Sequence, residues 1–252
     1  MRLSIVILTY NQRAYTLRLM ETLIPWLSVR EDVEVILVDN GSGDGTLDAV
    51  RTLPGIPAER VKLIRNSRNI GVAPGRNVGL RQARGEYVML LDNDTEASAH
   101  TFEGLISYLD SHPECGLAAP GLESAAGELQ DSAKPFPGLA LKIRHLLSKG
   151  PARAEREAMA SRHPFYVIGA CQMFRRSLLE KAGYLDQNIF YGPEDADWCM
   201  RIRETGYSVD YLPELRLIHH WQRATRRSPL SPLSRRHIRG LIHFWLKHRR
   251  LF

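Results

Sequence analysis

Residues 87–94 read YVMLLDND, five apolar residues followed by Asp92, Asn93 and Asp94. A short apolar run that ends in polar residues is typical of a strand buried on both faces of a parallel sheet. Two carboxylates one residue apart at a strand end can reach one hard divalent cation, because Mg²⁺ and Mn²⁺ prefer oxygen ligands. The structural alternative is a polar turn with a helix cap. The stretch therefore predicts a buried strand and, at its end, a candidate metal site.

The same pattern of an apolar run and a polar loop occurs three times before this stretch. The runs are residues 3–8, 33–38 and 61–64, and apolar residues at helical spacing follow them at 15–27, 46–53 and 73–84. Alternating strands and helices predict an α/β fold, a Rossmann-like sandwich with a mostly parallel central sheet. Ligands of such sheets bind at the carboxyl ends of the strands. We therefore expect the four polar loops to meet at one sheet edge and to form the binding site.

Two more residues at this edge suit a nucleotide. Asp39 ends the second strand, and its carboxylate could accept a hydrogen bond from a pyrimidine imide, while Gly41 and Gly43 let the backbone approach a ligand closely. Arg76 lies near a helix start, where a guanidinium can donate two hydrogen bonds to a diphosphate. A capped turn at Asp39 and a solvated Arg76 are the structural alternatives.

Acidic residues gather again at residues 194–198, which read EDADW. A carboxylate here could act as the general base that takes a proton from an acceptor hydroxyl. Carboxylates near a helix N-terminus also stabilise the helix dipole, which is the structural alternative. Further along, His219 and His220 follow the apolar run 215–218, and one of them could be a third metal ligand.

The positive charge of the chain is concentrated near its C-terminal end. The formal net charge is +6, but no acidic residue follows Glu214, and about ten Lys and Arg lie beyond it. Residues 235–252 carry apolar side chains at helical spacing among these basic ones, at Ile238, Leu241, Ile242 and Trp245. The pattern predicts a basic amphipathic helix that lies on an anionic membrane surface, or packs on its own domain or on a dimer mate. The rest of the chain is slightly acidic and shows no RNA-binding module, so we expect no nucleic-acid partner.

Several classes of protein are excluded by composition. The three cysteines, Cys115, Cys171 and Cys199, are widely spaced and form no CxxC pair, so we expect neither disulfides nor a cysteine zinc site. The longest apolar runs are strand-sized, far short of the roughly 20 residues of a membrane span. The N-terminus does not read as a signal peptide. We expect a cytoplasmic protein that could lie peripherally at the inner face of the plasma membrane.

Taken together, the motifs resemble those of family 2 glycosyltransferases, which have the GT-A fold, and most of all the bacterial rhamnosyltransferase-like branch. The motifs that carry the resemblance are residues 4–12 (SIVILTYNQ), 37–46 (LVDNGSGDGT), 68–79, 87–96 and 194–198. They occur in the order and spacing of the family over nearly the whole chain, residues 4–225. The resemblance implies inverting transfer of a sugar from a UDP- or dTDP-sugar to a hydroxyl of a glycan or lipid-linked glycan of cell-surface polysaccharide. It also implies a divalent cation, manganese or magnesium.

The resemblance further implies a role for each of several residues. Asp195 would be the catalytic base, and Glu194, Asp197 and Trp198 would support it on the acceptor side. The cation would bind Asp92, Asp94 and His219. The nucleotide-sugar would contact Thr9, Asn11, Asp39, Arg76, Asp92, Asn93, Gly169 and Ala170.

We expect three parts along the chain. Residues 1–96 would form the nucleotide-sugar-binding half, residues 97–225 the acceptor and catalytic half of the same domain, with a smaller acceptor-side region, and residues 226–252 the basic tail with its helix. The segment 131–164 has no clear family pattern and is expected to cover the site, which leaves the acceptor and the oligomeric state open.

Two alternative functions remain open. A nucleotidyltransferase would normally carry a glycine-rich loop with Arg or Lys after its first strand, where this chain has Thr9-Tyr10-Asn11-Gln12. A non-catalytic nucleotide-sugar-binding protein would not need both the aspartate pair and the acidic cluster. Both alternatives are therefore disfavoured.

Overall fold

The computed structural model describes residues 1–147, 153–220 and 231–251 of the protein. Its N-terminal part alternates strands and helices, as the sequence predicts. These elements are β1 (Leu3–Thr9), α1 (Arg13–Val29), β2 (Val33–Asp39), α2 (Thr46–Arg51), β3 (Val61–Arg65), α3 (Val72–Leu80) and β4 (Tyr87–Asp92). The four strands are parallel, with Thr9 beside Asp39 and Leu8 beside Asp92, so their carboxyl ends share one sheet edge. This confirms the predicted convergence of the polar loops.

The second part of the chain is less regular. Its elements are α4 (Ala99–Ser111), β5 (Cys115–Glu123), β6 (Ala133–Lys134), α5 (Leu139–Leu147), α6 (Arg153–Ala160), β7 (Tyr166–Val167), β8 (Cys171–Arg175), α7 (Leu178–Lys181), α8 (Glu194–Glu204), β9 (Ser208–Ile218) and α10 (Pro232–His248). Strands β6 and β7 form a small antiparallel pair of their own. The remaining strands of this part join the main sheet.

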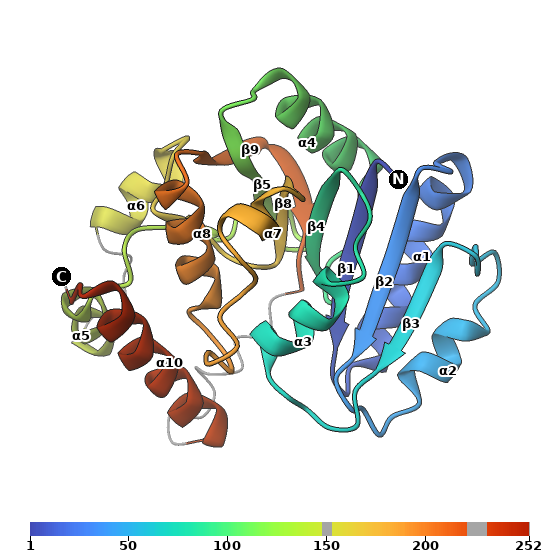
Figure 1. The fold of residues 1–252 in the computed structure, drawn as a ribbon, viewed down its shortest axis with the longest axis horizontal. Coiled ribbons are helices and arrows are strands. Elements are labelled where there is room, and N and C mark those ends of the chain that lie inside the picture. Colours follow the sequence, from blue (N-terminus) through green and yellow to red (C-terminus); the bar gives the residue numbers. More distant parts are fainter. Residues whose placement is uncertain (148–152, 221–230, 252) are drawn as a thin grey trace.

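The main sheet has seven strands in the order β3-β2-β1-β4-β8-β5-β9, with helices on both faces (Figure 1). Strand β8 runs antiparallel to β4 and β5, whereas β5 and β9 are parallel to each other. The prediction of a mostly parallel α/β sheet is therefore confirmed.

The central strands consist of nearly unbroken runs of apolar residues because helices cover both faces of the sheet. On β1, Ile5 packs in the cluster that contains Phe102 of α4, and the next residue, Val6, packs in the cluster that contains Trp198 of α8. Successive side chains of a strand point to opposite faces, so a strand covered on both sides is apolar at nearly every position, and its buried polar residues, such as Ser4, are hydrogen-bonded.

Helix α3 ends at Leu80, earlier than the predicted residue 84. The amide of Arg84 donates to the Ser4 hydroxyl and to the Glu34 carboxylate, and the amide of Gly85 donates to the same hydroxyl. These buried side-chain acceptors on β1 and β2 take the amides that a longer helix would have used. The chain therefore leaves the helix and enters β4.

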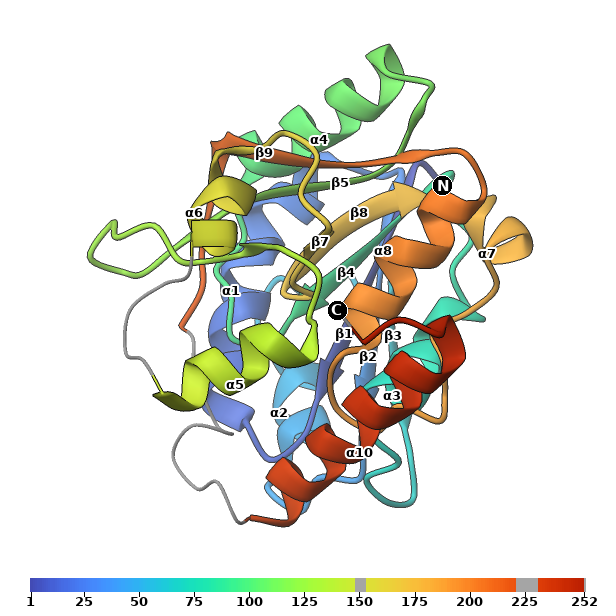
Figure 2. The ribbon, with the colours of Figure 1, turned by 90° about the vertical axis from the view of Figure 1, so that its left-hand side faces the viewer.

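Helix α10 confirms a helix in the basic tail but corrects its buried face. Leu241 and Phe244 are buried, whereas Ile238 and Ile242, predicted on the same side as Leu241, are exposed. The indole of Trp245 donates a hydrogen bond to the carbonyl of Pro137, just before α5. Figure 2 shows α5 and α10 together on one side of the molecule.

The predicted boundary between the acceptor half and the tail falls at residues 225 and 226, outside the described residues. The division into three parts stays a prediction. Among the described residues, no helix is both long and apolar enough to cross a bilayer.

Candidate active site

A cavity of about 540 Å³ lies at the carboxyl ends of β1 and β4. Its walls come from the loops after these strands, from the segment 166–170, from the N-terminus of α8 and from the inner side of α10. Elements from both parts of the chain therefore enclose one site, at the sheet edge that the sequence pattern predicts.

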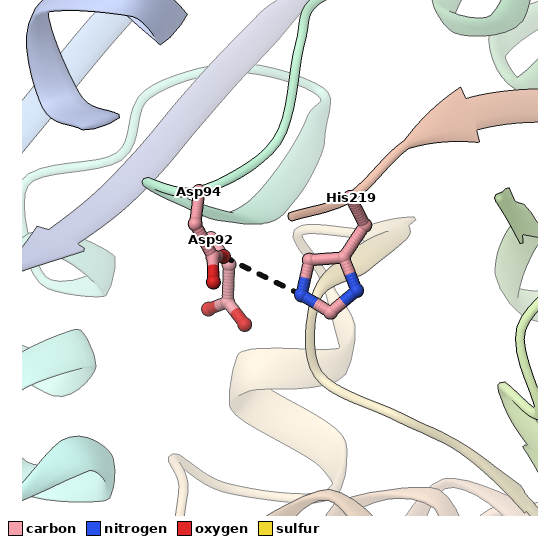
Figure 3. Close-up of side chains that lie close together, drawn as sticks. All are labelled: Asp92, Asp94 and His219. Carbon is pink, nitrogen blue, oxygen red and sulfur yellow. Dashed lines mark ion pairs between the residues drawn. The ribbon is translucent and has the colours of Figure 1, made fainter. Parts of the chain in front are cut away.

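On one wall, Asp92, Asp94 and His219 meet (Figure 3). One potential ligand atom from each residue lies within 4.8 Å of the others, and His219 Nε2 is 3.4 Å from Asp94 Oδ1. The chain after β9 pairs with the chain after β4, since the amide of His220 donates to the Asp94 carbonyl and Thr95 bridges His219. This pairing brings the histidine next to the aspartates, although they are far apart in sequence.

The surroundings of His219 prepare it to bind a cation. Gln130 donates from Nε2 to the His219 carbonyl, so its Oε1 is left to accept from His219 Nδ1, at 2.8 Å. In the tautomer that carries its proton on Nδ1, the other ring nitrogen, Nε2, is free to bind a cation beside Asp94. The two carboxylates and this imidazole nitrogen then offer a cation two oxygens and one nitrogen. Such a donor set fits Mn²⁺ or Mg²⁺. His220 instead contacts Glu96, so His219 is the histidine of the group.

Arg76 links three parts of the site. Its guanidinium lies 2.5 Å from Asp92 Oδ1, donates to the Gly169 carbonyl at 2.8 Å and approaches Glu194 within 3.6 Å. Burial alone would lower the pKa of Arg76, but the charges of Asp92 and Glu194 more than offset this and raise it. A Cβ at Gly169 would come within 2.5 Å of the guanidinium, so glycine leaves the space that Arg76 occupies.

The first two residues of α8 face the cavity from the other side. Asp195 is half-buried and accepts a hydrogen bond from the amide of Ala196. Burial raises the pKa of its carboxyl above the ordinary value. Glu194 is buried, and its pKa rises to about 7, first through burial and then through the charge of Asp195. Its Oε2 has no hydrogen-bond partner within the described part of the chain.

The other two residues of the predicted acceptor group, Asp197 and Trp198, do not reach the cavity. Asp197 is fully buried and pairs with Arg201, Lys247 and His248. Trp198 is also fully buried and packs against a core phenylalanine of β8. Of the residues of α8, only Glu194 and Asp195 line the cavity, because successive residues of a helix point in directions about 100° apart. The structure does not place these two side chains, Asp197 and Trp198, at the cavity, and their acceptor-side role stays a prediction.

The predicted nucleotide-sugar residues separate into two groups. Thr9, Arg76, Asp92, Asn93, Gly169 and Ala170 line the cavity. Asn11 and Asp39 do not: Asn11 accepts from the Gly43 amide, and Asp39 accepts from the Ser42 amide. These two side chains connect the loops after β1 and β2 beside the cavity, so they shape its rim in this structure. Their predicted contacts with a nucleotide stay predictions.

Other residues of the site were not predicted from the sequence. Lys134, Lys142, Tyr166 and His237 also line the cavity, and the two lysines lie in the segment 131–164 expected to cover the site. Lys134 and Lys142 belong to a stretch with no acidic residue between Asp131 and Glu155, which is a charge signal that could have marked them. His237 and Gln130 had no local signal, since each reaches the site through tertiary packing.

Comparison with known proteins identifies the family. The family model described as "Glycosyl transferase family 2" matches residues 4–183. A relative named N-acetylglucosaminyl-diphospho-decaprenol L-rhamnosyltransferase, from Mycobacterium tuberculosis, is 27% identical over 93% of this chain and 81% of its own length. The dTDP-rhamnosyl transferase RfbF of Shigella flexneri is 24% identical over 85% of this chain and 67% of its own.

Solved glycosyltransferases share the fold. A mannosyltransferase from Pyrobaculum calidifontis, solved with GDP-Man and Mn²⁺, superposes with a TM-score of 0.70 at 21% identity, over 98% of this chain and 64% of its own. Staphylococcus aureus TarS 1–349 with UDP superposes with a TM-score of 0.63 at 22% identity, over 86% and 60%. The chain thus spans less than two thirds of each of these solved chains. The solved structures show the GT-A fold, and the family match over residues 4–183 excludes the nucleotidyltransferase alternative. Because that match spans more than half of the chain, this chain belongs to glycosyltransferase family 2, as an enzyme that transfers sugars.

Proposed function

We propose that this enzyme transfers a sugar, with inversion at the anomeric carbon, from a UDP- or dTDP-linked donor to a hydroxyl of a lipid-linked glycan for cell-surface polysaccharide. The observation that carries the proposal is the pairing of two groups across one cavity. Asp92, Asp94 and His219 form a donor set for a divalent cation, and the carboxylate of Asp195 lines the same cavity.

The donor diphosphate would lie beside the aspartate pair. A cation bound by Asp92, Asp94 and His219 supplies positive charge that offsets the charge of the leaving diphosphate. The guanidinium of Arg76 donates hydrogen bonds to both the Asp92 carboxylate and the Gly169 carbonyl. These bonds keep the carboxylate in one orientation. The sugar would then lie against Gly169 and Ala170.

The acceptor would be activated by Asp195. Its carboxylate takes the proton of the acceptor hydroxyl, whose oxygen forms the new bond to the anomeric carbon. The bond from that carbon to the diphosphate oxygen breaks on the opposite face, so the configuration inverts. The raised pKa of Asp195 makes it a stronger base than an exposed aspartate, which favours this transfer.

The relatives suggest which substrates to test first. Two of them are named rhamnosyltransferases, one with a dTDP-rhamnosyl donor and one with a diphospho-decaprenol acceptor. We therefore propose dTDP-rhamnose as the first donor and a diphosphate-linked lipid glycan as the first acceptor. We also propose a cytoplasmic location, which suits the three free and buried cysteines.

The experiment is calorimetric titration with dTDP and UDP, each with Mn²⁺, with Mg²⁺ and with EDTA. We expect cation-dependent binding of one nucleotide, and the tighter nucleotide identifies the donor class. Equal binding in EDTA would contradict the cation site, and no binding of either nucleotide would contradict the proposed donor. Product stereochemistry, read from the anomeric coupling by NMR, then tests inversion.

A further inference from the structure

The surface of α10 that points away from the protein is unusually apolar. Ile238, Ile242 and Leu246 are 54%, 48% and 74% exposed. They are spaced four residues apart, so on a helix they form one line along the same side. Arg235 and Arg239 have the same spacing and lie along this line. We call these five residues the outer face of α10.

The orientation of α10, with this face toward solvent, is set by specific contacts. The opposite side of α10 is already fixed to the body of the protein. Gly240 packs on the Gly192 carbonyl so closely that a Cβ would lie 2.4 Å from the oxygen. Lys247 and His248 bond to the buried Asp197 of α8. The outer face therefore stays outside, and its exposed isoleucine and leucine side chains need another explanation.

The charges that α10 and α5 carry themselves are all positive, and the aspartates that pair with Lys247 of α10, Asp186 and Asp197, are 11% and 0% exposed. No acidic residue occurs from residue 215 to the last residue, 252, and none occurs in α5. Helix α5 begins beside the end of α10, where the Leu139 amide donates to the Leu251 carbonyl, and it exposes Ile143 and Arg144. Exposed apolar side chains with arginines beside them and no carboxylate on the same face fit a surface of anionic headgroups with acyl chains beneath.

A second copy of the chain fits this face less well. If two outer faces met about a twofold axis, the four arginines of the two copies would share one interface with no carboxylate on either face to offset them. An anionic bilayer offers the opposite charge. We infer that the outer face of α10 docks on an anionic lipid bilayer.

Docking would bring the bilayer close to the catalytic cavity. Leu233 and His237 of α10 line the cavity, while the outer face points the other way. The cavity would then lie about one helix diameter, roughly 10 Å, from the lipid surface. A lipid-linked acceptor could reach Asp195 without leaving the bilayer. This consequence rests on the proposed function, whereas the docking itself does not.

The test is co-sedimentation of the full chain with vesicles of phosphatidylglycerol and phosphatidylcholine in comparison with pure phosphatidylcholine. We expect binding to the anionic vesicles and little to the neutral ones. The double variant Ile242→Ser/Leu246→Ser should lower the partition coefficient about tenfold or more, because it removes the apolar contact. The variant Arg235→Gln/Arg239→Gln should weaken binding and flatten its dependence on salt.

The matched control is Val29→Ser. Val29 is 76% exposed on α1, on the other side of the molecule from α10 (Figure 1), so its loss should leave vesicle binding unchanged. Thermal midpoints of all variants confirm that each is folded. Absence of binding to anionic vesicles, or equal binding by Ile242→Ser/Leu246→Ser, overturns the inference. A dimer in sedimentation that this double variant dissociates, without vesicle binding, also overturns it.

Activity on a water-soluble acceptor separates this inference from the proposed function. We expect the outer-face variants to keep that activity and to lose vesicle binding. A chain that binds vesicles but transfers no sugar would contradict the proposed function alone. A chain that transfers sugar but ignores vesicles would contradict the docking alone.

Discussion

Glu194 and Asp195 are neighbours in sequence with different surroundings. Glu194 is buried next to Arg76, whereas Asp195 is half-buried at the cavity wall. Asparagine has nearly the shape of aspartate but cannot take a proton. We expect Asp195→Asn to lower turnover about 10³-fold while nucleotide affinity stays unchanged, measured by initial rates and by calorimetry. A parallel loss of affinity would make Asp195 a structural residue.

Glu194 should make stability depend on pH. Its folded-state pKa, about 7, lies above the ordinary 4.5, mainly because of burial. Its contribution to the unfolding free energy is therefore full below about pH 4.5 and is lost as pH rises through about 7. The variant Glu194→Gln has no carboxyl group to ionise, so it does not lose this stability as pH rises. Its stability relative to wild type should rise by up to roughly 3 kcal/mol between these limits.

Urea unfolding over this pH range measures the difference. The control is Glu204→Gln, because Glu204 lies on the same helix with its side chain exposed. Parallel pH profiles for wild type and Glu194→Gln would show that Glu194 holds no proton in the folded state.

Gln130 orients His219 without touching the cation itself. Gln130→Leu should lower Mn²⁺ affinity about 10- to 100-fold, since the Nδ1 proton loses its acceptor and the imidazole its orientation. Mn²⁺ binding can be followed by electron paramagnetic resonance, with the exposed Gln187→Leu as control. Unchanged affinity would mean that His219 is held by the backbone pairing alone.

At the scale of elements, α8 and α10 are joined by one buried carboxylate. Asp197→Asn leaves Arg201, Lys247 and His248 without their shared anion. We expect a loss of about 3 kcal/mol in unfolding free energy, with little change in turnover of the folded enzyme. Denaturant melts and initial rates separate these effects. If Asp197→Asn kept full stability but lost turnover, this result would support the acceptor-side role that the sequence predicts for Asp197.

The first four strands could be predicted because each carries its signal locally. An apolar run such as residues 33–38 identifies a buried strand whatever its neighbours are. Strand β5 gave no such signal, because Gly116, Pro120 and Gly121 interrupt it, and its pairing with β9 shifts register at Pro120. Strand β8 has an ordinary composition, and its antiparallel place between β4 and β5 depends on contacts that no local pattern encodes.

The site was predictable to the same extent. Asp92, Asp94 and Asp195 stand in motifs next to element ends, and the structure places all three at the cavity. Asp197 was assigned to the site because of its neighbours in sequence, yet a helix turns it toward α10. Periodicity also misassigned α10, since it cannot tell which of two apolar lines, Ile238–Ile242 or Leu241–Phe244, faces the protein.

At the scale of the molecule, the cavity is built from residues of both parts of the chain. The cation set takes Asp92 and Asp94 from the first part and His219 from the second. Nucleotide and cation together should therefore stabilise the whole fold. At ligand concentrations near 100 times Kd, we expect the thermal midpoint to rise by about 5–10 °C with Mn²⁺, and far less with EDTA. Differential scanning fluorimetry checks this, and equal shifts in both conditions would contradict it.

The parallel pairing of β5 with β9 has a consequence for how the protein is made. The strands β1 to β4 are joined by short connections and can pair soon after synthesis. β5 joins the sheet only through β8 and β9, which begin at Cys171 and Ser208, so it must wait for later parts of the chain. His219 follows β9 directly, so a chain still leaving the ribosome can present both aspartates long before the histidine arrives. Tight capture of the cation would then mark the end of folding, and a nascent chain would be unable to hold a nucleotide-sugar prematurely.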